Sequence, residues 1–218
     1  MDIESARQNM VDCQIKTWDV FDLDVIEAFL TIKREDFVPT TYKKLAFADT
    51  SLDLDDNQTM MSPKLEARLL QALSLTKKDK VLEVGTGTGH MTALLSVLSK
   101  EVVSFECRSS LFEKAKSNLE KANIKNTTLL CGNGLTEFNR FAPFDAVVFS
   151  GSLPKRDKKI EESLAIEGRM FAIIGTGDVM EAILIQRISV SDWHSETLFE
   201  TSAEILQGAE IPPVFRFE

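Results

Sequence analysis

The nine residues that decide the fold of this chain are Val81-Leu82-Glu83-Val84-Gly85-Thr86-Gly87-Thr88-Gly89. A short, mostly apolar run leads into three glycines at alternate positions, and a helical pattern follows from Met91 to Leu98. Glycine lets the backbone turn sharply and approach a ligand, because no Cβ intervenes. The stretch therefore predicts a strand, a ligand-binding turn and a helix, the first unit of an open α/β fold.

Short apolar runs alternate with helical patterns beyond this unit. Further strands are expected over 102–105, 127–130, 146–149 and 170–174, with helices over 111–119 and 160–165. This alternation is typical of parallel βαβ units with helices on both faces of the sheet. The last two apolar runs, 182–188 and 196–199, flank a polar turn region and predict an antiparallel hairpin that closes the sheet.

The first 75 residues follow a different pattern. Apolar residues recur near the helical period over 20–30 and 65–73, whereas 49–61 look irregular. We predict a single domain over 1–218, with a helical region (1–75), a core with a doubly wound, mostly parallel sheet (76–190), and a C-terminal strand and tail (191–218).

Composition excludes several classes of protein. The 218 residues carry a formal charge of −9, which repels phosphate backbones and disfavours a nucleic-acid partner. No signal peptide or membrane-length apolar run is visible, so a cytoplasmic protein without membrane association is expected, with a monomer favoured. Three widely spaced cysteines indicate thiols in a reducing compartment, and with only His90 and His194 beside them no metal site is expected.

The spacing of the glycines indicates which of two kinds of cofactor, a dinucleotide or a methionine-containing nucleoside, this turn binds. A dinucleotide fingerprint, G-x-G-x-x-G, requires glycine at position 90, where this chain has His90. Glu83, two residues before the first glycine, suits the amino group of a methionine moiety. The sequence thus predicts a Rossmann-like class I methyltransferase that uses S-adenosyl-L-methionine (AdoMet) and releases S-adenosyl-L-homocysteine.

Two further segments fit this cofactor. Glu106, with Cys107 beside it, ends the second strand about 20 residues after the first glycine, where an acid holds the ribose hydroxyls. Asn133 follows the third strand and can accept a hydrogen bond from an adenine amino group, although a plain glycine-rich turn is the alternative. His90 either caps or packs at the start of the helix, with a catalytic role as the alternative.

Several motifs occur together in the order found in a known family. They are Arg34-Glu35-Asp36-Phe37-Val38-Pro39, Ala46-Phe47-Ala48-Asp49, Asn57-Gln58-Thr59-Met60-Met61-Ser62-Pro63, Glu83 to Gly89, Glu106, Gly132-Asn133-Gly134 and Ala142-Pro143-Phe144-Asp145-Ala146-Val147-Val148. With these motifs, roughly from Arg7 to Gly175, the chain resembles the protein-L-isoaspartate O-methyltransferases.

This resemblance implies methyl esterification of the free carboxylate of isoaspartyl residues in damaged proteins, as a step of protein repair. It also implies that the Gln58 to Pro63 segment covers the cofactor and shapes the substrate pocket. Residues then expected to contact the cofactor are Gln58, Met60, Met61, Glu66, Glu83, Gly85, Thr86, Gly87, Thr88, Gly89, His90, Glu106, Cys107, Asn133 and Gly134.

The chain departs from the family pattern at the expected active-site serine, which is replaced by Met61. Thr59 and Ser62 are therefore the candidate catalytic hydroxyls. Asn133 replaces an aspartate, and Ser150-Gly151-Ser152 stands where the family has an alanine-rich turn.

A carboxylate acceptor is already ionised at neutral pH and needs no general base, which agrees with the scarcity of histidines. Two alternatives are an AdoMet methyltransferase with another, small-molecule acceptor and a non-catalytic AdoMet-binding protein. The segment 203–218, with Gln207 and the Ile211–Phe217 strip, is a further candidate to reach the pocket.

Overall fold

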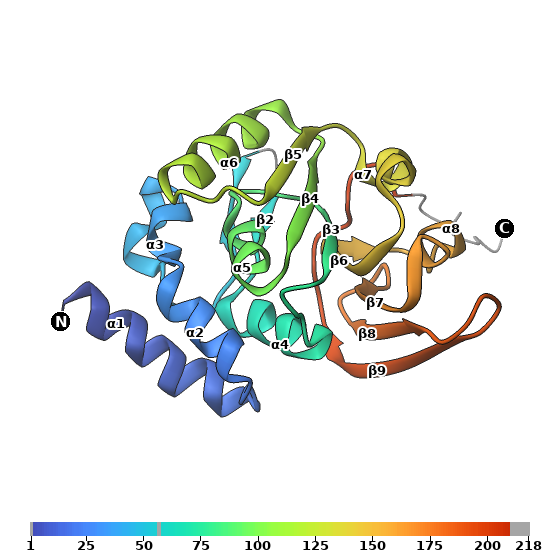
Figure 1. The fold of residues 1–218 in the computed structure, drawn as a ribbon. Helices are drawn as coiled ribbons and strands as arrows, with labels where there is room; N and C mark the ends of the chain where they lie inside the picture. The colour runs from blue at the N-terminus through green and yellow to red at the C-terminus, as the bar shows by residue number, and fades with distance from the viewer. Residues whose placement is uncertain (1, 56–57, 210–218) are drawn as a thin grey trace, which may run out of the picture.

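A seven-stranded sheet forms the centre of the computed structural model, which describes residues 2–55 and 58–209 (Figure 1). The strand order is β5-β4-β3-β6-β7-β8-β9. The strands are β3 (Lys80–Val84), β4 (Glu101–Glu106), β5 (Thr127–Cys131), β6 (Phe144–Leu153), β7 (Leu164–Ile174), β8 (Met180–Arg187) and β9 (Trp193–Thr201). Strands β3 to β7 pair in parallel, and β8 and β9 add antiparallel. The predicted fold class, with its closing hairpin, is confirmed. Asn57 and the Ile211–Phe217 strip lie outside the described residues.

Helices cover the sheet and form the N-terminal region. They are α1 (Ile3–Met10), η1 (Val11–Ile15), η2 (Lys16–Trp18), α2 (Leu23–Thr31), α3 (Arg34–Phe37), η3 (Thr40–Leu45), α4 (Pro63–Leu73), α5 (His90–Leu98), α6 (Ser109–Lys121), α7 (Gly134–Glu137), η5 (Phe138–Phe141) and α8 (Lys158–Glu161). In Figure 1 the blue helices α1 to α3 lie on the opposite side of the molecule from the red tip of the β8–β9 hairpin. Within the described residues, no helix is long and apolar enough to span a membrane.

Two apolar clusters hold the layers together, one on each face of the sheet. Neighbouring strand residues divide between them, because successive side chains of a strand point to opposite faces. Val81 and Val148 pack with the apolar sides of α2, α4 and α5, whereas Leu82 and Val147 pack with residues of η5 and α8. This division explains why the parallel strands read as continuous apolar runs: both of their faces are buried.

The structure differs from the sequence prediction at two places. The irregular stretch 49–61 contains a small antiparallel pair, β1 (Leu52–Asp53) and β2 (Thr59–Met60). The helix expected over 160–165 begins earlier, at Lys158, because Asp157 caps it by accepting from Lys159 N. It ends at Glu161, since Leu164 already pairs with Phe144 in the sheet.

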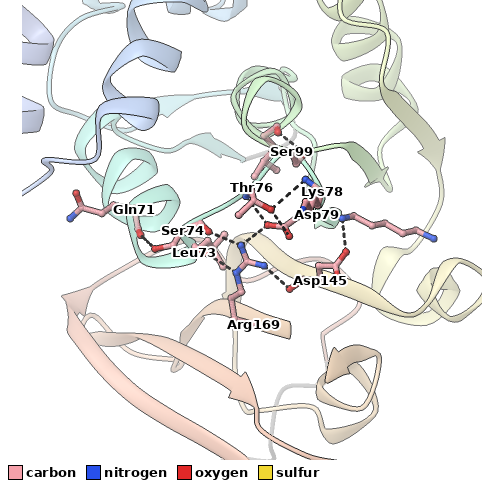
Figure 2. A network of polar contacts seen from close by, with 11 residues as sticks. Gln71, Leu73, Ser74, Thr76, Lys78, Asp79, Ser99, Asp145 and Arg169 are labelled. Carbon is pink, nitrogen blue, oxygen red and sulfur yellow. Dashed lines mark hydrogen bonds and ion pairs between the residues drawn. The ribbon is translucent and has the colours of Figure 1, made fainter. Parts of the chain in front are cut away.

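A polar network ties the end of α4 to the sheet (Figure 2). Arg169 on β7 donates to the carbonyls of Leu73 and Ser74 at 2.6 and 2.9 Å, and to that of Asp145 at 3.1 Å. It also pairs with Asp79 at 2.7 Å. Burial would raise the pKa of Asp79, but the bonds from Arg169 and Thr76 outweigh it and hold that pKa below its ordinary value. One arginine thus joins the N-terminal region to the core.

The chain crosses back over the sheet after β9. Residues 202–209, which we call the C-terminal strap, run beside the end of β6. Ser152 N donates to Glu204 O at 2.8 Å, and Leu206 N donates to Ser152 O at 3.0 Å. The strap is thereby fixed above the carboxyl ends of the central strands.

Candidate active site

The loop between β3 and α5 contains three glycines in left-handed conformations. The φ angle is 96° at Gly85, 57° at Gly87 and 88° at Gly89, a region that residues with a Cβ rarely adopt. Gly85 N and Thr86 N donate to Phe105 O at 2.9 and 3.2 Å, which fixes the loop to the end of β4. The result is a backbone turn at the edge of the sheet where α/β proteins bind ligands.

Glu106, the last residue of β4, faces this loop. Its Oε2 accepts from Gly87 N at 2.8 Å and its Oε1 accepts from Arg108 N at 3.0 Å. The residue is only 3% exposed. Each carboxylate oxygen can accept more than one hydrogen bond, so both retain capacity for a hydroxyl donor. Such a group suits the two ribose hydroxyls of a nucleoside.

Asn133 caps α7 at the end of β5. Its Oδ1 accepts from Leu135 N at 3.0 Å. Gly134, the next residue, has no space for a side chain, because a Cβ would lie 2.8 Å from Phe105 Cβ and 3.0 Å from Val84 Cγ1. Since Asn133 also lines the cavity described next, the turn and ligand-contact interpretations are compatible.

These groups line one cavity, which we call the cofactor pocket. Its empty volume is about 690 Å³, including space open to solvent. The predicted residues that line it are Gln58, Thr59, Met60, Met61, Glu66, Gly85, Thr86, Gly87, Thr88, His90, Glu106, Cys107, Asn133 and Gly134. The N-terminal segment and the βα loops therefore meet at one place.

Three predicted residues lie outside the lining of the cofactor pocket. Gly89 is the N-cap of α5, and a Cβ there would meet Leu119 Cγ at 3.2 Å. Ser62 precedes α4 and lines a separate depression with Trp18 and Phe199. Glu83 lies fully buried beneath the glycine loop.

Glu83 is held by three hydroxyls. Thr92 and Ser104 donate to its Oε2 at 2.5 and 2.7 Å, and Ser150 donates to its Oε1 at 3.3 Å. Burial raises the pKa of Glu83 to about 7, although these hydrogen bonds oppose the shift. The carboxyl group is therefore partly protonated at neutral pH. It does not line the pocket itself, but its hydrogen-bond partner Ser150 does.

A second cavity, the acceptor groove, adjoins the cofactor pocket. It runs between the Gln58–Met61 segment, the β7–β8 turn and the C-terminal strap. The residues that line both cavities are Gln58, Thr59, Met61 and Ser150. They form the junction between the two cavities.

A buried ionic cluster supports this junction, and its central residue, Arg34, has no role that the sequence predicts. Arg34 is 0% exposed, pairs with Glu66, and donates to Met61 O at 2.6 Å and Ala46 O at 3.1 Å. His90 Nδ1 lies 3.0 Å from Glu66 Oε2 and 3.2 Å from Arg34 Nη1, and so joins the same cluster. Arg34 lies in the quoted Arg34–Pro39 motif, but no local pattern separates a buried arginine from a surface one.

His90 packs at the start of α5 and does not cap it, because Gly89 is the N-cap. Its ring contacts the edges of Phe29 and Phe37. Burial lowers the pKa of His90 below its ordinary value despite the nearby Glu66, so the ring is neutral at neutral pH. This environment favours a packing and positioning role.

The C-terminal strap also lines the cofactor pocket, through Leu206 and Gln207. Cys107 Sγ donates to Gln207 Oε1 at 3.4 Å. A Cβ at Gly85 would lie 3.1 Å from Leu206 Cδ2, so the strap passes directly over the glycine loop. Gln207 thus reaches the pocket, whereas no residue pattern indicated Leu206.

The sheet order, glycine loop and Glu106 define a class I AdoMet-dependent methyltransferase. A scan against family models then matches residues 5–201 to Protein-L-isoaspartate(D-aspartate) O-methyltransferase. The chain belongs to this family. It is accordingly an AdoMet-dependent protein carboxyl methyltransferase that acts on isoaspartyl residues, and another acceptor or a non-catalytic role is not favoured.

Individual relatives agree with this assignment. A protein-L-isoaspartate O-methyltransferase from Petrotoga mobilis is 35% identical over 177 residues, which cover 81% of this chain and 83% of the relative. Protein-L-isoaspartate O-methyltransferase 2 from Marinobacter nauticus is 30% identical and covers 96% of both chains. A solved structure from Plasmodium falciparum, a putative protein-L-isoaspartate O-methyltransferase in complex with S-adenosyl-L-homocysteine, superposes with a TM-score of 0.80 at 18% identity. It covers 95% of this chain and 99% of its own, and supports the fold.

The pocket fits AdoMet on its own chemistry. Glu106 offers acceptors to hydroxyls, Asn133 offers an amide to a base, and the turn at Gly85 and Gly87 exposes backbone without a Cβ. Polar groups that differ in kind therefore stand at separate places along one cavity, as an elongated nucleoside cofactor requires.

Proposed function

We propose that the cofactor pocket holds AdoMet and the acceptor groove holds an isoaspartyl segment, so that methyl transfer takes place at their junction. The observation that carries this proposal is the set of residues shared by both cavities. A transfer reaction needs two reactants in line and close together, which contiguous cavities provide. The region 1–75 supplies the cap of a single methyltransferase domain.

Within the cofactor pocket, Glu106 accepts from the ribose hydroxyls and Asn133 contacts the adenine amino group. Met60, Met61 and Cys107 form its walls; Met60 Sδ accepts from Thr88 Oγ1 at 3.8 Å, which fixes one wall against the glycine loop. The loop receives the methionine end of the cofactor, above the buried Glu83.

The chemistry needs few protein groups. Bound AdoMet supplies a methyl group to a carboxylate oxygen, the C–S bond breaks with its electron pair on sulfur, and the products are a methyl ester and S-adenosyl-L-homocysteine. No proton is transferred, since the acceptor is already ionised. The chain must therefore orient the carboxylate and exclude water from it.

Thr59 is the residue of the Gln58–Met61 segment that brings a hydroxyl group to the junction. It lies two residues before Met61, which occupies the position of the family's serine. We assign it to the orientation of the acceptor. Ser62 faces the depression beside Trp18 instead, so we expect Ser62→Ala to affect methyl transfer less than Thr59→Ala.

We further propose that the protein acts in the cytoplasm as a monomer, without a nucleic-acid or membrane partner. Cys13, Cys107 and Cys131 are all free and exposed, which suits a reducing compartment. The charge of −9 disfavours binding to phosphate backbones. Sedimentation analysis of the purified chain tests the oligomeric state.

The function is tested with methyl-labelled AdoMet and two peptides that differ only in isoaspartate or aspartate at one position. We expect base-labile label on the isoaspartyl peptide alone. Equal labelling of both peptides, or cofactor binding without transfer to either, would contradict the proposal. A parallel incubation with pooled small carboxylates and amines tests for another acceptor.

A further inference from the structure

Ser150 is the junction residue that comes from the core of the protein. The other three residues that line both cavities belong to the Gln58–Met61 segment. Ser150 lies on β6, which pairs with β3 on one side and β7 on the other. Ser150 itself follows Phe149, the last residue paired with β3, and falls within the register shift of the β6–β7 pairing between Val148 and Ser152. Irregularities of this kind re-aim side chains next to active sites.

The neighbourhood of Ser150 is the point where the strand order reverses. From β3 the chain first adds β4 and β5 on one side, and then β6 on the other. Ligands of open α/β sheets bind at this switch point. A Cβ at Gly85 would lie 3.5 Å from Ser150 Cβ, so Ser150 directly adjoins the loop assigned to the methionine end of the cofactor.

The charge of the acceptor groove makes a neutral donor necessary. The charged residues that line it, among those the structure describes, are Asp178 and Glu204, both acids. A carboxylate acceptor desolvated there must receive hydrogen bonds, or it pays the cost of an unpaired charge. The neutral donors that line the groove are hydroxyls, backbone N–H groups and the side-chain amide of Gln58.

We propose that the Ser150 hydroxyl donates a hydrogen bond to the acceptor carboxylate and holds it beside the methyl donor. This inference rests on the proposed function. Ser150 binds one carboxylate oxygen, while the other oxygen attacks the methyl carbon. The hydroxyl keeps its proton throughout, and the serine compensates for the family serine replaced by Met61.

The partner of Ser150 supports this role. Glu83 Oε1 lies 3.3 Å from Ser150 Oγ. Ser150 donates this bond while Glu83 is ionised. Because burial raises the pKa of Glu83 to about 7, the carboxyl group is also populated in its protonated form, and the bond then reverses so that Glu83 Oε1 donates to Ser150 Oγ. The serine's own proton is then available to the acceptor, and an anion beside the incoming carboxylate is avoided.

The test compares three variants by steady-state kinetics with the isoaspartyl peptide and AdoMet. Ser150→Ala removes the hydroxyl, and Ser150→Thr keeps it. Ser104→Ala is the matched control, because Ser104 also donates to Glu83, at 2.7 Å, but lines neither cavity. A merely structural role of Ser150 in holding Glu83 would make the two alanine variants alike.

We expect Ser150→Ala to lower kcat/KM for the peptide by about 10- to 100-fold, as loss of a hydrogen bond to a charged group implies. KM for the peptide rises, whereas Ser150→Thr stays within about threefold of the parent and Ser104→Ala changes the peptide KM little. Equal kinetics for Ser150→Ala and Ser104→Ala, or a loss confined to AdoMet affinity, would overturn the assignment.

A binding measurement separates this inference from the function. Peptide binding to the protein saturated with S-adenosyl-L-homocysteine is measured by calorimetry, where no turnover is possible. Weaker binding of the isoaspartyl peptide to Ser150→Ala than to Ser104→Ala supports the serine even if the parent transfers no methyl group. Unchanged binding in Ser150→Ala overturns it even if the parent is active, and failure of the parent to bind the peptide overturns both.

Discussion

Glu83 shows how one buried carboxyl group can set the pH dependence of stability. Its pKa is raised from an ordinary 4.5 to about 7, chiefly by burial. Between these values the native state holds a proton that the unfolded chain has released. The free energy of unfolding therefore falls as pH rises through this window and levels off above it.

Glu83→Gln should remove this fall in the free energy of unfolding at higher pH. An amide can replace the protonated carboxyl group and keep the hydrogen bonds from Thr92 and Ser104. Relative to the parent, we expect its free energy of unfolding to gain ~3 kcal/mol between about pH 5 and pH 8. Urea unfolding at several pH values measures this difference. The same series on the exposed Glu113→Gln should be flat; a flat series for Glu83→Gln would contradict the protonated state.

Arg34 illustrates the cost of breaking a buried ion pair. Arg34→Met leaves the Glu66 carboxylate without its cation and the Met61 carbonyl without its donor. We expect the free energy of unfolding to fall by ~3–5 kcal/mol, and Arg34→Met combined with Glu66→Leu to recover part of it. Thermal and urea denaturation measure both. A double variant less stable than Arg34→Met would show that the stranded carboxylate is not the main penalty.

At the scale of elements, the end of β4 and the glycine loop act as one unit. Glu106 accepts from Gly87 N, so its carboxylate both shapes the loop and faces the pocket. For Glu106→Gln we expect S-adenosyl-L-homocysteine to bind ~10–100-fold more weakly, as loss of charge-assisted hydrogen bonds implies. Isothermal titration calorimetry measures the dissociation constant, with Glu113→Gln on α6 as the control. An unchanged constant would remove Glu106 from the ribose site.

The elements that the sequence predicted are those with a local signal. The strand, glycine loop and helix from Lys80 to Leu98 follow from an apolar run, three glycines and a helical period. The β1–β2 pair has no comparable signal, because each strand has two residues. The prediction of a helix up to residue 165 is wrong, because α8 ends at Glu161. Pairing of Leu164 with Phe144 in the sheet overrides the helical pattern.

The candidate site divides in the same way. The cofactor side depends on residues next to strand ends, which a motif can locate. Arg34, Ser150 and Leu206 reach the site through contacts between segments far apart in the chain. No spacing within the sequence indicates such contacts, so the part that these residues play in the site could not be predicted from the sequence.

At the scale of the whole molecule, Arg169 links the end of α4 in the N-terminal region to the core (Figure 2). Arg169→Met removes its bonds to Leu73, Ser74 and Asp79. We expect ~3 kcal/mol lower stability and faster amide hydrogen exchange in α4 than in β8. Hydrogen exchange with mass spectrometry measures the two regions separately.

The matched control for this prediction is Arg187→Met. Arg187 also donates to main-chain carbonyls, those of Glu162 and Leu164, but has no bond to α4. Equal protection losses in α4 for both variants would mean that the effect is general destabilisation.

The C-terminal strap also has a consequence for synthesis of the protein. The walls of the cofactor pocket come from positions as far apart as Leu54 and Gln207. A nascent chain can form β3, α5 and β4 early, because domains fold as the ribosome releases them. It has no complete cavity until Gln207 has emerged, so a partly synthesised copy cannot bind the methyl donor as the finished protein does.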